Sequence, residues 1–276
     1  GTGISCGVDS FHVLAKQASP NGTKNLRLTH LAFNNVGSHG TGAKGQAMYA
    51  WHKARAAAFC NRNGFQLVSS DSNIADAFSQ SFLVTHIYSG CFAIYALQKL
   101  WRTYFYASSG YDLNDFSLVN SENFGAGRYE LLSLATFSTH ELKIYSEGVA
   151  LTRLDKIRVV AEYEPAYEFL SVCGKHPNCG KCRKCKRTLL ELYAIDRLDN
   201  FRASFDIDYF HSHTDWYMIR FLSKYWQRDP YYVRIYPLLK TRLTLKVRIL
   251  ALLRCGIHAM LKNIKNKRLE RAGKKF

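Results

Sequence analysis

The residues Ser5-Cys6-Gly7-Val8-Asp9-Ser10 are the first group in the chain whose types and spacing suit chemistry. Small residues at a strand-to-helix turn let backbone N–H groups approach an anion, and the start of a helix adds partial positive charge. The two serines offer hydroxyl donors, and Asp9 suits a Mg²⁺ ion that bridges its carboxylate to phosphate. The pattern favours a phosphate-binding loop made of Ser5, Cys6, Gly7, Val8, Asp9 and Ser10. The alternative is an ordinary turn in which Asp9 caps a helix.

Four of the eight cysteines form a second cluster: Cys173, Cys179, Cys182 and Cys185. Two overlapping C-x-x-C units and a nearby fourth thiol supply the ligands of a tetrahedral ion, and Zn²⁺ in a closed structural site fits best. An iron–sulfur cluster and a metal-free basic loop are the alternatives. The other cysteines are scattered, which is typical of a reducing compartment, so we expect a cytoplasmic protein.

Strands and helices must alternate along the chain to position these two groups. Strands are expected at 26–33, 65–69, 103–107 and 141–145. Helices are expected at 11–18, 46–61, 81–100, 153–162 and 188–198. This alternation predicts an α/β fold, in which a Rossmann-like parallel sheet carries helices on both faces.

The serine-containing loop resembles the S-G-G-x-D-S signature of the PP-loop ATP pyrophosphatases, with Cys6 where glycine is usual. That family includes asparagine, GMP and NAD synthetases, tRNA thiolases and 7-cyano-7-deazaguanine synthase. The segment from Ser171 to Thr188 resembles the zinc segment of the deazaguanine synthases. Leu154-Asp155-Lys156 is similar to the L-x-K that starts the family's preceding helix. The resemblance runs from Ser5 to about Leu198, and its PP-loop (HUP-type) fold agrees with the predicted α/β class.

The resemblance implies an ATP-consuming ligase with ATP, Mg²⁺ and Zn²⁺ as cofactors. A small-molecule carboxylate or amide oxygen is adenylated with release of pyrophosphate, and a nitrogen donor then displaces AMP. Asp9 and Lys156 are its expected catalytic residues, although a helix lysine is more often solvated. We expect Asp9→Asn to abolish turnover while leaving the fold intact. A tRNA thiolase and a non-catalytic nucleotide-binding module are the alternative functions.

Several weaker candidates lie near the expected sheet. Those on its ligand-binding side are Asn34, His39, Gly40 and Ser108-Ser109-Gly110. A flexible surface loop is the alternative for the first three residues. We expect His86 to be a packed helix residue. Turn and cap roles are expected for Ser138, Thr139 and His140.

The chain divides by composition into an α/β domain at 1–204, with the zinc segment at 173–185, and an aromatic, basic, helical extension at 205–276. Gly1 replaces a start methionine directly before the first motif, so we expect missing upstream residues. The formal charge is +17, and residues 240–276 hold 12 of the 38 Lys and Arg but one of the 21 acids. This basic tail predicts packing on the enzyme domain or in a homo-oligomer, with RNA and an anionic membrane as alternatives.

Overall fold

The computed structural model describes residues 1–18, 27–79, 81–108, 125–175 and 177–257. The strands are β1 (Thr2–Gly3), β2 (His30–Asn35), β3 (Gln66–Asp71), β4 (Thr103–Ala107) and β5 (Lys143–Glu147). The helices are α1 (Val8–Ala18), α2 (Gly42–Asn63), α3 (Ile74–Phe78), α4 (Phe82–Ala96), α5 (Glu130–Thr136), α6 (Arg153–Ala161), α7 (Pro165–Phe169), α8 (Arg183–Ala194), α9 (Ile207–Ser212), α10 (Thr214–Trp226) and α11 (Pro230–Leu239). Short 3-10 helices lie at Ala126–Tyr129, Leu198–Phe201 and Lys240–Arg242.

The five strands form one parallel sheet in the order β3-β2-β1-β4-β5. The short strand β1 is central. After β3 the chain crosses to the other side of β1 to form β4, so the strand order reverses between β1 and β4. In parallel α/β sheets such a reversal opens a crevice at the carboxyl ends of the strands, where ligands bind. The loop after β1, which holds the Ser5–Ser10 motif, lies at this crevice.

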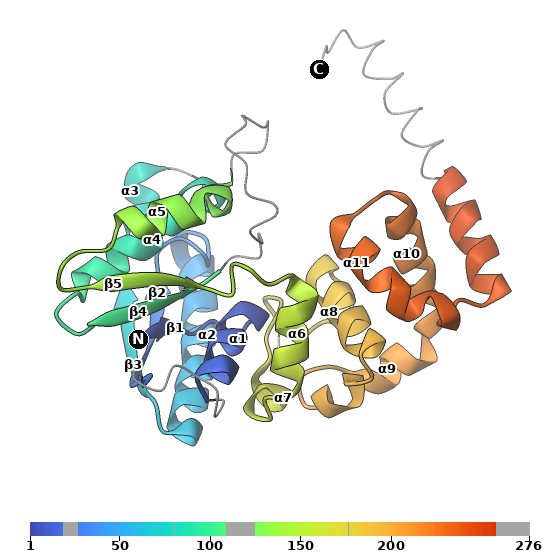
Figure 1. The fold of residues 1–276 in the computed structure, drawn as a ribbon, viewed down its shortest axis with the longest axis horizontal. Helices are drawn as coiled ribbons and strands as arrows, with labels where there is room; N and C mark the ends of the chain where they lie inside the picture. The colour runs from blue at the N-terminus through green and yellow to red at the C-terminus, as the bar shows by residue number, and fades with distance from the viewer. Residues whose placement is uncertain (19–26, 80, 109–124, 176, 258–276) are drawn as a thin grey trace, which may run out of the picture.

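Alternating side chains of the strands build a separate hydrophobic core on each face of the sheet. Leu31, Phe33 and Phe105 belong to the core that contains α1, α2, α6 and α8. Their neighbours Ala32 and Tyr104 belong to the core beneath α4 and α5. Because successive strand residues point to opposite faces, this division follows directly from the sequence. Figure 1 shows α3, α4 and α5 together on one side of the sheet. The predicted α/β class with helices on both faces is confirmed.

Most predicted elements are present, but several bounds were wrong for identifiable reasons. Strand β4 occupies the expected residues 103–107. Strand β2 begins later than expected, at His30, and it ends later because Asn34 and Asn35 extend it beyond the apolar run. The Asn34 carboxamide accepts a hydrogen bond from Ser70 Oγ (2.8 Å), and Asn35 donates one to Asp71 (2.7 Å), so polar pairs continue the pairing with β3.

The helix expected at 188–198 was also wrong in its bounds, since α8 starts at Arg183 and ends at Ala194. Cys182 Sγ accepts a hydrogen bond from Cys185 N and so caps the start of the helix. The cysteine cluster therefore sets where α8 begins. Asp196, with φ of 57°, lies just beyond its end.

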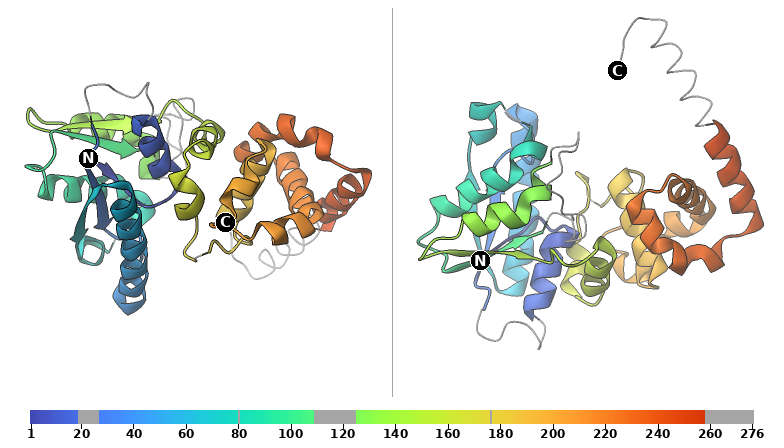
Figure 2. Two further views of the ribbon diagram at one scale, coloured as in Figure 1. Left: turned by 90° about the horizontal axis from the view of Figure 1, so that it is seen from below. Right: turned by 45° about the horizontal axis from the view of Figure 1, so that its top comes forward.

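The extension is a helical layer that packs beyond α6 and α8, and these two helices separate it from the sheet (Figures 1 and 2). A further helix spans residues 245–257. Leu243, Val247 and Ala251 are buried in the main core, so one face of the basic tail packs on the protein. Its opposite face is exposed at Leu245, Ile249, Leu252, Leu253 and Ile257. Among the described residues, no helix is long and apolar enough to cross a membrane.

Candidate functional site

The loop Ser5–Ser10 joins the central strand β1 to α1 and presents a group of hydrogen-bond donors. Ser5 Oγ and Ser10 Oγ lie 3.3 Å apart, the Gly7 N–H donates to Ser5 Oγ (3.2 Å), and Ser10 Oγ donates to the Gly7 carbonyl (3.0 Å). The first N–H groups of α1 have no acceptor within the helix. Hydroxyls and free amides at the positive end of an 11-residue helix suit an anion.

Cys6 has a left-handed backbone, with φ of 55°, and its side chain is only 2% exposed. Left-handed positions favour glycine, which is the usual residue here in the family that the loop resembles. The Cys6 carbonyl accepts a hydrogen bond from Ser171 N (2.7 Å), which ties the loop to the segment before the cysteine cluster. Burial raises the pKa of the Cys6 thiol to about 12. A buried, protonated thiol is a poor nucleophile, so Cys6 does not suit sulfur transfer.

Lys156 joins α6 to the loop through an ion pair in which the lysine is buried and Asp9 is partly exposed. Its Nζ lies 3.2 Å from Asp9 Oδ1 and donates to the Ser108 carbonyl at 3.0 Å. The alternative of a solvated Lys156 was wrong, since the residue is fully buried. The Lys156 ammonium lies behind Asp9 and does not line the cavity in front of the loop. It therefore positions the Asp9 carboxylate, while Asp9 itself faces the cavity.

A cavity of about 640 Å³ opens at the carboxyl ends of the strands and includes the loop. Asp9 is the one carboxylate among the described residues that line it. The cations on its wall are Arg153, Lys184 and Arg187. One carboxylate among three cations and a donor-rich loop makes the cavity suitable for a phosphate chain.

The two arginines are held in place by acidic and aromatic neighbours. Arg153 donates to Glu191 (3.1 Å) and to Thr188 (2.9 Å), and this buried contact fixes its guanidinium. Burial raises the pKa of Glu191 in spite of the arginine. Arg187 lies 4.0 Å from the ring of Tyr231, and burial lowers the pKa of its guanidinium. Arg187 Nε has no partner among the described residues and is free to bind a ligand oxygen.

The weaker candidates divide between the cavity and other places. Asn34, His39 and His86 line the cavity, whereas Gly40 does not. His86, expected as a packed residue, is half-buried there, and burial lowers its pKa. Ser108 is buried at the end of β4, with no partner for its hydroxyl, and Ser109 and Gly110 lie outside the described residues.

Ser138 and Thr139 take the expected turn role at the start of β5. The hydroxyl of Ser138 accepts a hydrogen bond from Ile144 N (3.0 Å), and that of Thr139 accepts one from Leu142 N (3.0 Å). His140 is almost fully exposed beside them. All strands of the sheet are parallel, so the start of β5 lies at the end of the sheet opposite the cavity, which is at the carboxyl ends of the strands. Ser138, Thr139 and His140 therefore do not line the cavity.

Sequence reasoning missed Arg153, Arg187, His52 and Tyr231 as cavity residues. A signal for the two arginines was present, because Arg153 begins a predicted helix beside Leu154 and Arg187 directly precedes the predicted helix at 188–198. The contribution of Tyr231 depends on how α11 packs on α8, which no local pattern indicates.

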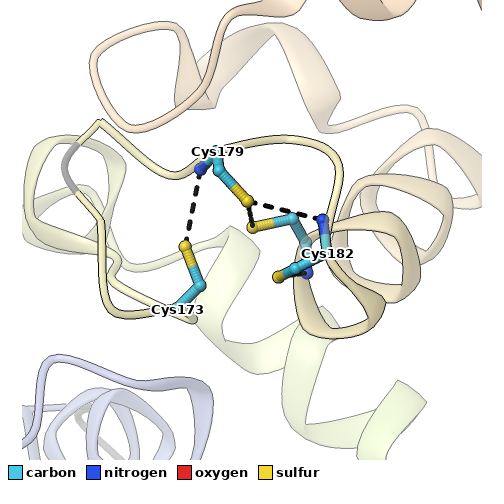
Figure 3. Close-up of side chains that lie close together, drawn as sticks. Cys173, Cys179 and Cys182 are labelled. Atoms are coloured by element: carbon cyan, nitrogen blue, oxygen red, sulfur yellow. Dashed lines mark hydrogen bonds between the residues drawn. The ribbon is translucent and has the colours of Figure 1, made fainter.

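The cysteine cluster brings four sulfur atoms together at one end of α8. All four lie within 4.8 Å of one another, and Cys179 Sγ is 3.8 Å from Cys185 Sγ. Sulfurs placed about 2.3 Å from a tetrahedral zinc ion are about 3.8 Å apart, so the spacing fits. Figure 3 shows the N–H groups of Cys179 and Cys182 directed at neighbouring sulfurs, each at 3.4 Å. Such bonds stabilise thiolates, and they lower the pKa of Cys179 to about 7 although burial acts in the opposite direction.

The loop that holds the cluster is fixed from several sides. Asn178 donates to the carbonyls of Leu170 (2.8 Å) and Ser204 (3.0 Å), and its own carbonyl oxygen accepts from Val172 N (2.8 Å). Gly180 adopts a left-handed turn with φ of 65°. These contacts preform a four-sulfur site with no open position for a reactant, which is typical of structural zinc.

Comparisons of this chain with protein-family models, curated proteins and solved structures found no match. The fold and the two sites define an α/β protein that has a loop rich in hydrogen-bond donors beside the central strand of its sheet and a four-cysteine cluster able to hold a metal such as zinc.

Proposed function

We propose that this protein is an ATP-dependent ligase that adenylates an oxygen atom of a small molecule and releases pyrophosphate. The observation that carries the proposal is the Asp9–Lys156 pair at the carboxyl end of the central strand, 3.2 Å apart and directly beside the donor-rich loop. These two residues are 147 positions apart in the chain and were selected by a resemblance to one family. Two residues that the resemblance names as catalytic are therefore in direct contact, which supports a common role at the loop.

The phosphate chain of ATP would bind along the loop and the cationic wall of the cavity. Ser5, Ser10 and the first amides of α1 would donate to the phosphate oxygens, and Arg187 and Lys184 would offset their charge. Asp9, one-third exposed, is the residue that would hold Mg²⁺. Mg²⁺, when bound, neutralises charge on the leaving pyrophosphate. Lys156 would keep the Asp9 carboxylate oriented toward the cavity.

The chemistry takes place in two displacements. A carboxylate or amide oxygen of the substrate attacks the α-phosphorus, and the bond from that phosphorus to the bridging oxygen breaks to release pyrophosphate. A nitrogen nucleophile then attacks the activated carbon, AMP leaves with the C–O bonding electrons, and the nitrogen gives up a proton. The chain's own residues bind, orient and neutralise charge in both steps. This sequence is that of 7-cyano-7-deazaguanine synthase-like ligases.

Among the alternatives, sulfur transfer to tRNA is disfavoured by the thiols. Burial raises the pKa values of Cys60 and Cys91 to about 11 and about 12, so both remain protonated. Both are buried, like Cys6, and the four clustered thiols suit a metal. Cys255, which is partly exposed, lies in the extension and does not line the cavity at the loop. A nucleotide-binding module without activity shares the cavity but not the release of pyrophosphate.

The test is an ATP turnover assay with a panel of small carboxylic acids and amides, with ammonium as nitrogen donor. We expect the wild-type protein to form AMP and pyrophosphate in equal amounts. The rate of their formation should be at least 100-fold lower in Arg187→Gln and in Asp9→Asn. Lys143→Gln, at the opposite edge of the sheet, is the matched control and should behave as wild type. Tight binding of ATP without turnover would favour the alternative of a nucleotide-binding module without catalytic activity. No ATP binding at millimolar concentration would refute the proposal.

A further inference from the structure

A second cavity, of about 290 Å³, lies in the extension and is separate from the loop. It is enclosed by α8, α10, the start of α11 and the helix at 245–257. Its described lining residues are Arg183, Lys186, Leu190, Tyr217, Arg220, Ser223, Lys224, Gln227, Asp229, Tyr232, Arg254 and Cys255. Its volume is near the lower end of the range for small-molecule sites, which suits a small ligand or one end of a larger one.

The charge of this cavity is strongly unbalanced. Five of its lining residues are Lys or Arg, and Asp229 is the one acid among them. The Asp229 carboxylate accepts a hydrogen bond from Tyr231 N (3.3 Å) as the cap of α11 and lies 3.8 Å from Arg183. The first turn of α8 contains no acidic residue, so the partial positive charge of that helix end adds to the cations.

Arg220 and Arg254 have no acidic neighbour to offset their charge. Neither has a carboxylate within ion-pair distance among the described residues. Arg220 lies 4.3 Å from the ring of Trp216, its Nε is buried without a partner, and its pKa is lowered by burial and then by Arg254. The clustered thiolates partly balance Lys186, but they do not balance these two arginines. Holding two arginines close together without a carboxylate costs free energy because their positive charges repel each other. Such an arrangement is typical of a binding site in which a negatively charged ligand balances the charge.

We propose that this second cavity binds the phosphate groups of a phosphorylated ligand. Two guanidinium groups, each with several fixed N–H donors, match the oxygens of phosphate, and Arg stacked on an aromatic ring is already oriented. Tyr232 and Ser223 add hydroxyl groups to the wall. The proposal does not depend on ATP chemistry at the loop.

Pyrophosphate without Mg²⁺ is the probe, titrated at constant ionic strength with chloride as the competing anion. Cys255 gives a local readout, because it lines this cavity and is partly exposed. We expect pyrophosphate to slow alkylation of Cys255 by iodoacetamide at least tenfold, measured by peptide mass spectrometry. Unchanged alkylation up to 10 mM pyrophosphate, roughly the weak limit of specific binding, would overturn the proposal.

Arg254→Gln removes one guanidinium from an exposed helix position and should weaken pyrophosphate binding about tenfold or more. Arg102→Gln, an equal charge change on an exposed residue at the start of β4, is the control and should have no effect. Arg254→Glu should raise the thermal midpoint of the free protein, because a carboxylate then faces Arg220, and should abolish protection of Cys255. Equal protection in wild type, Arg254→Gln and Arg254→Glu would refute the site.

A short single-stranded RNA in the same assay identifies the source of the phosphate. Competition between RNA and pyrophosphate, with an affinity for RNA that falls steeply with salt, would assign the cavity to a phosphodiester backbone. Protection by pyrophosphate alone would assign it to a small phosphorylated molecule. Both results support a phosphate site. If neither RNA nor pyrophosphate protects Cys255, the proposal is contradicted.

Discussion

The substitution Asp9→Asn removes the charge partner of a buried lysine, and its cost can be worked out from the structure. Asp9 Oδ1 and Lys156 Nζ are 3.2 Å apart, which at an effective dielectric constant near 20 corresponds to about 5 kcal/mol. The Asp9 side chain is 33% exposed, so water screens part of this attraction, whereas Lys156 is 1% exposed and has no such relief. We therefore expect Asp9→Asn to lower the free energy of unfolding by about 3 kcal/mol.

The converse substitution should cost less because the two partners differ in exposure. In Lys156→Met the buried cation is gone, the methionine fills most of its volume, and water still reaches the Asp9 carboxylate. We expect a loss of about 1 kcal/mol. The double variant should then be more stable than Asp9→Asn alone by about 2 kcal/mol, since no unpaired buried cation remains.

Urea titration followed by tryptophan fluorescence, with the protein saturated with zinc, measures all three variants. Asp196→Asn is the matched control, because Asp196 pairs with Arg242 at 2.7 Å on the surface and should cost about 0.5 kcal/mol. The expectation from sequence, that Asp9→Asn leaves the fold intact, treats Asp9 as a turn residue and omits Lys156. A cost for Asp9→Asn no larger than that of the control, or a double variant less stable than Asp9→Asn, would refute the reasoning.

Three further predictions concern the metal, the loop and pH. Chelation, or Cys182→Ser, should lower the thermal midpoint in calorimetry because metal binding is coupled to folding; purified protein with neither zinc nor iron would contradict the site. Cys6→Gly should preserve ATP turnover and change stability in urea by less than about 1 kcal/mol, since relief of the left-handed backbone offsets the lost thiol; loss of turnover would assign that thiol a chemical role. Burial, assisted by Lys156, lowers the pKa of His12 from 6.5 to about 4, so stability should fall as pH drops through this range, by at most about 3 kcal/mol. In His12→Phe, the free energy of unfolding measured in urea should vary less with pH over this range. The same dependence on pH as in the wild type would contradict the role of His12.

Local patterns in the sequence were sufficient for four of the five strands, for the place of the loop before a helix and for the four-cysteine cluster, whereas the two-residue strand β1 was not predicted. The aromatic run at 103–107 has one interpretation, and four thiols within 13 residues need no tertiary information to suggest a metal. Lys156 is different, because a lysine between an acid and an isoleucine on a helix is ordinarily solvated. Its burial depends on Asp9 and Ser108, which come from other parts of the chain, so only the resemblance could indicate it.

The charges of α8 were visible in the sequence, but their division between two cavities was not. Arg183 and Lys186 line the second cavity, and Lys184 and Arg187 line the first. Neighbouring helix residues point about 100° apart, so a run of cations covers both sides once the helix start is fixed. That start is fixed by Cys182, whose sulfur caps the helix and belongs to the cysteine cluster.

The cysteine cluster therefore acts on both cavities through one helix end. Four cations in five residues at the positive end of α8 repel one another and the helix dipole, and an isolated helix would not begin there. Four thiolates around a divalent ion would carry a net double negative charge a few ångströms away and offset this repulsion, and the metal–sulfur bonds would hold Cys182 at the N-cap and Cys185 in the first turn. Loss of a bound metal should thus loosen Arg187 in one cavity and Arg183 in the other together, although neither residue belongs to the four-cysteine cluster.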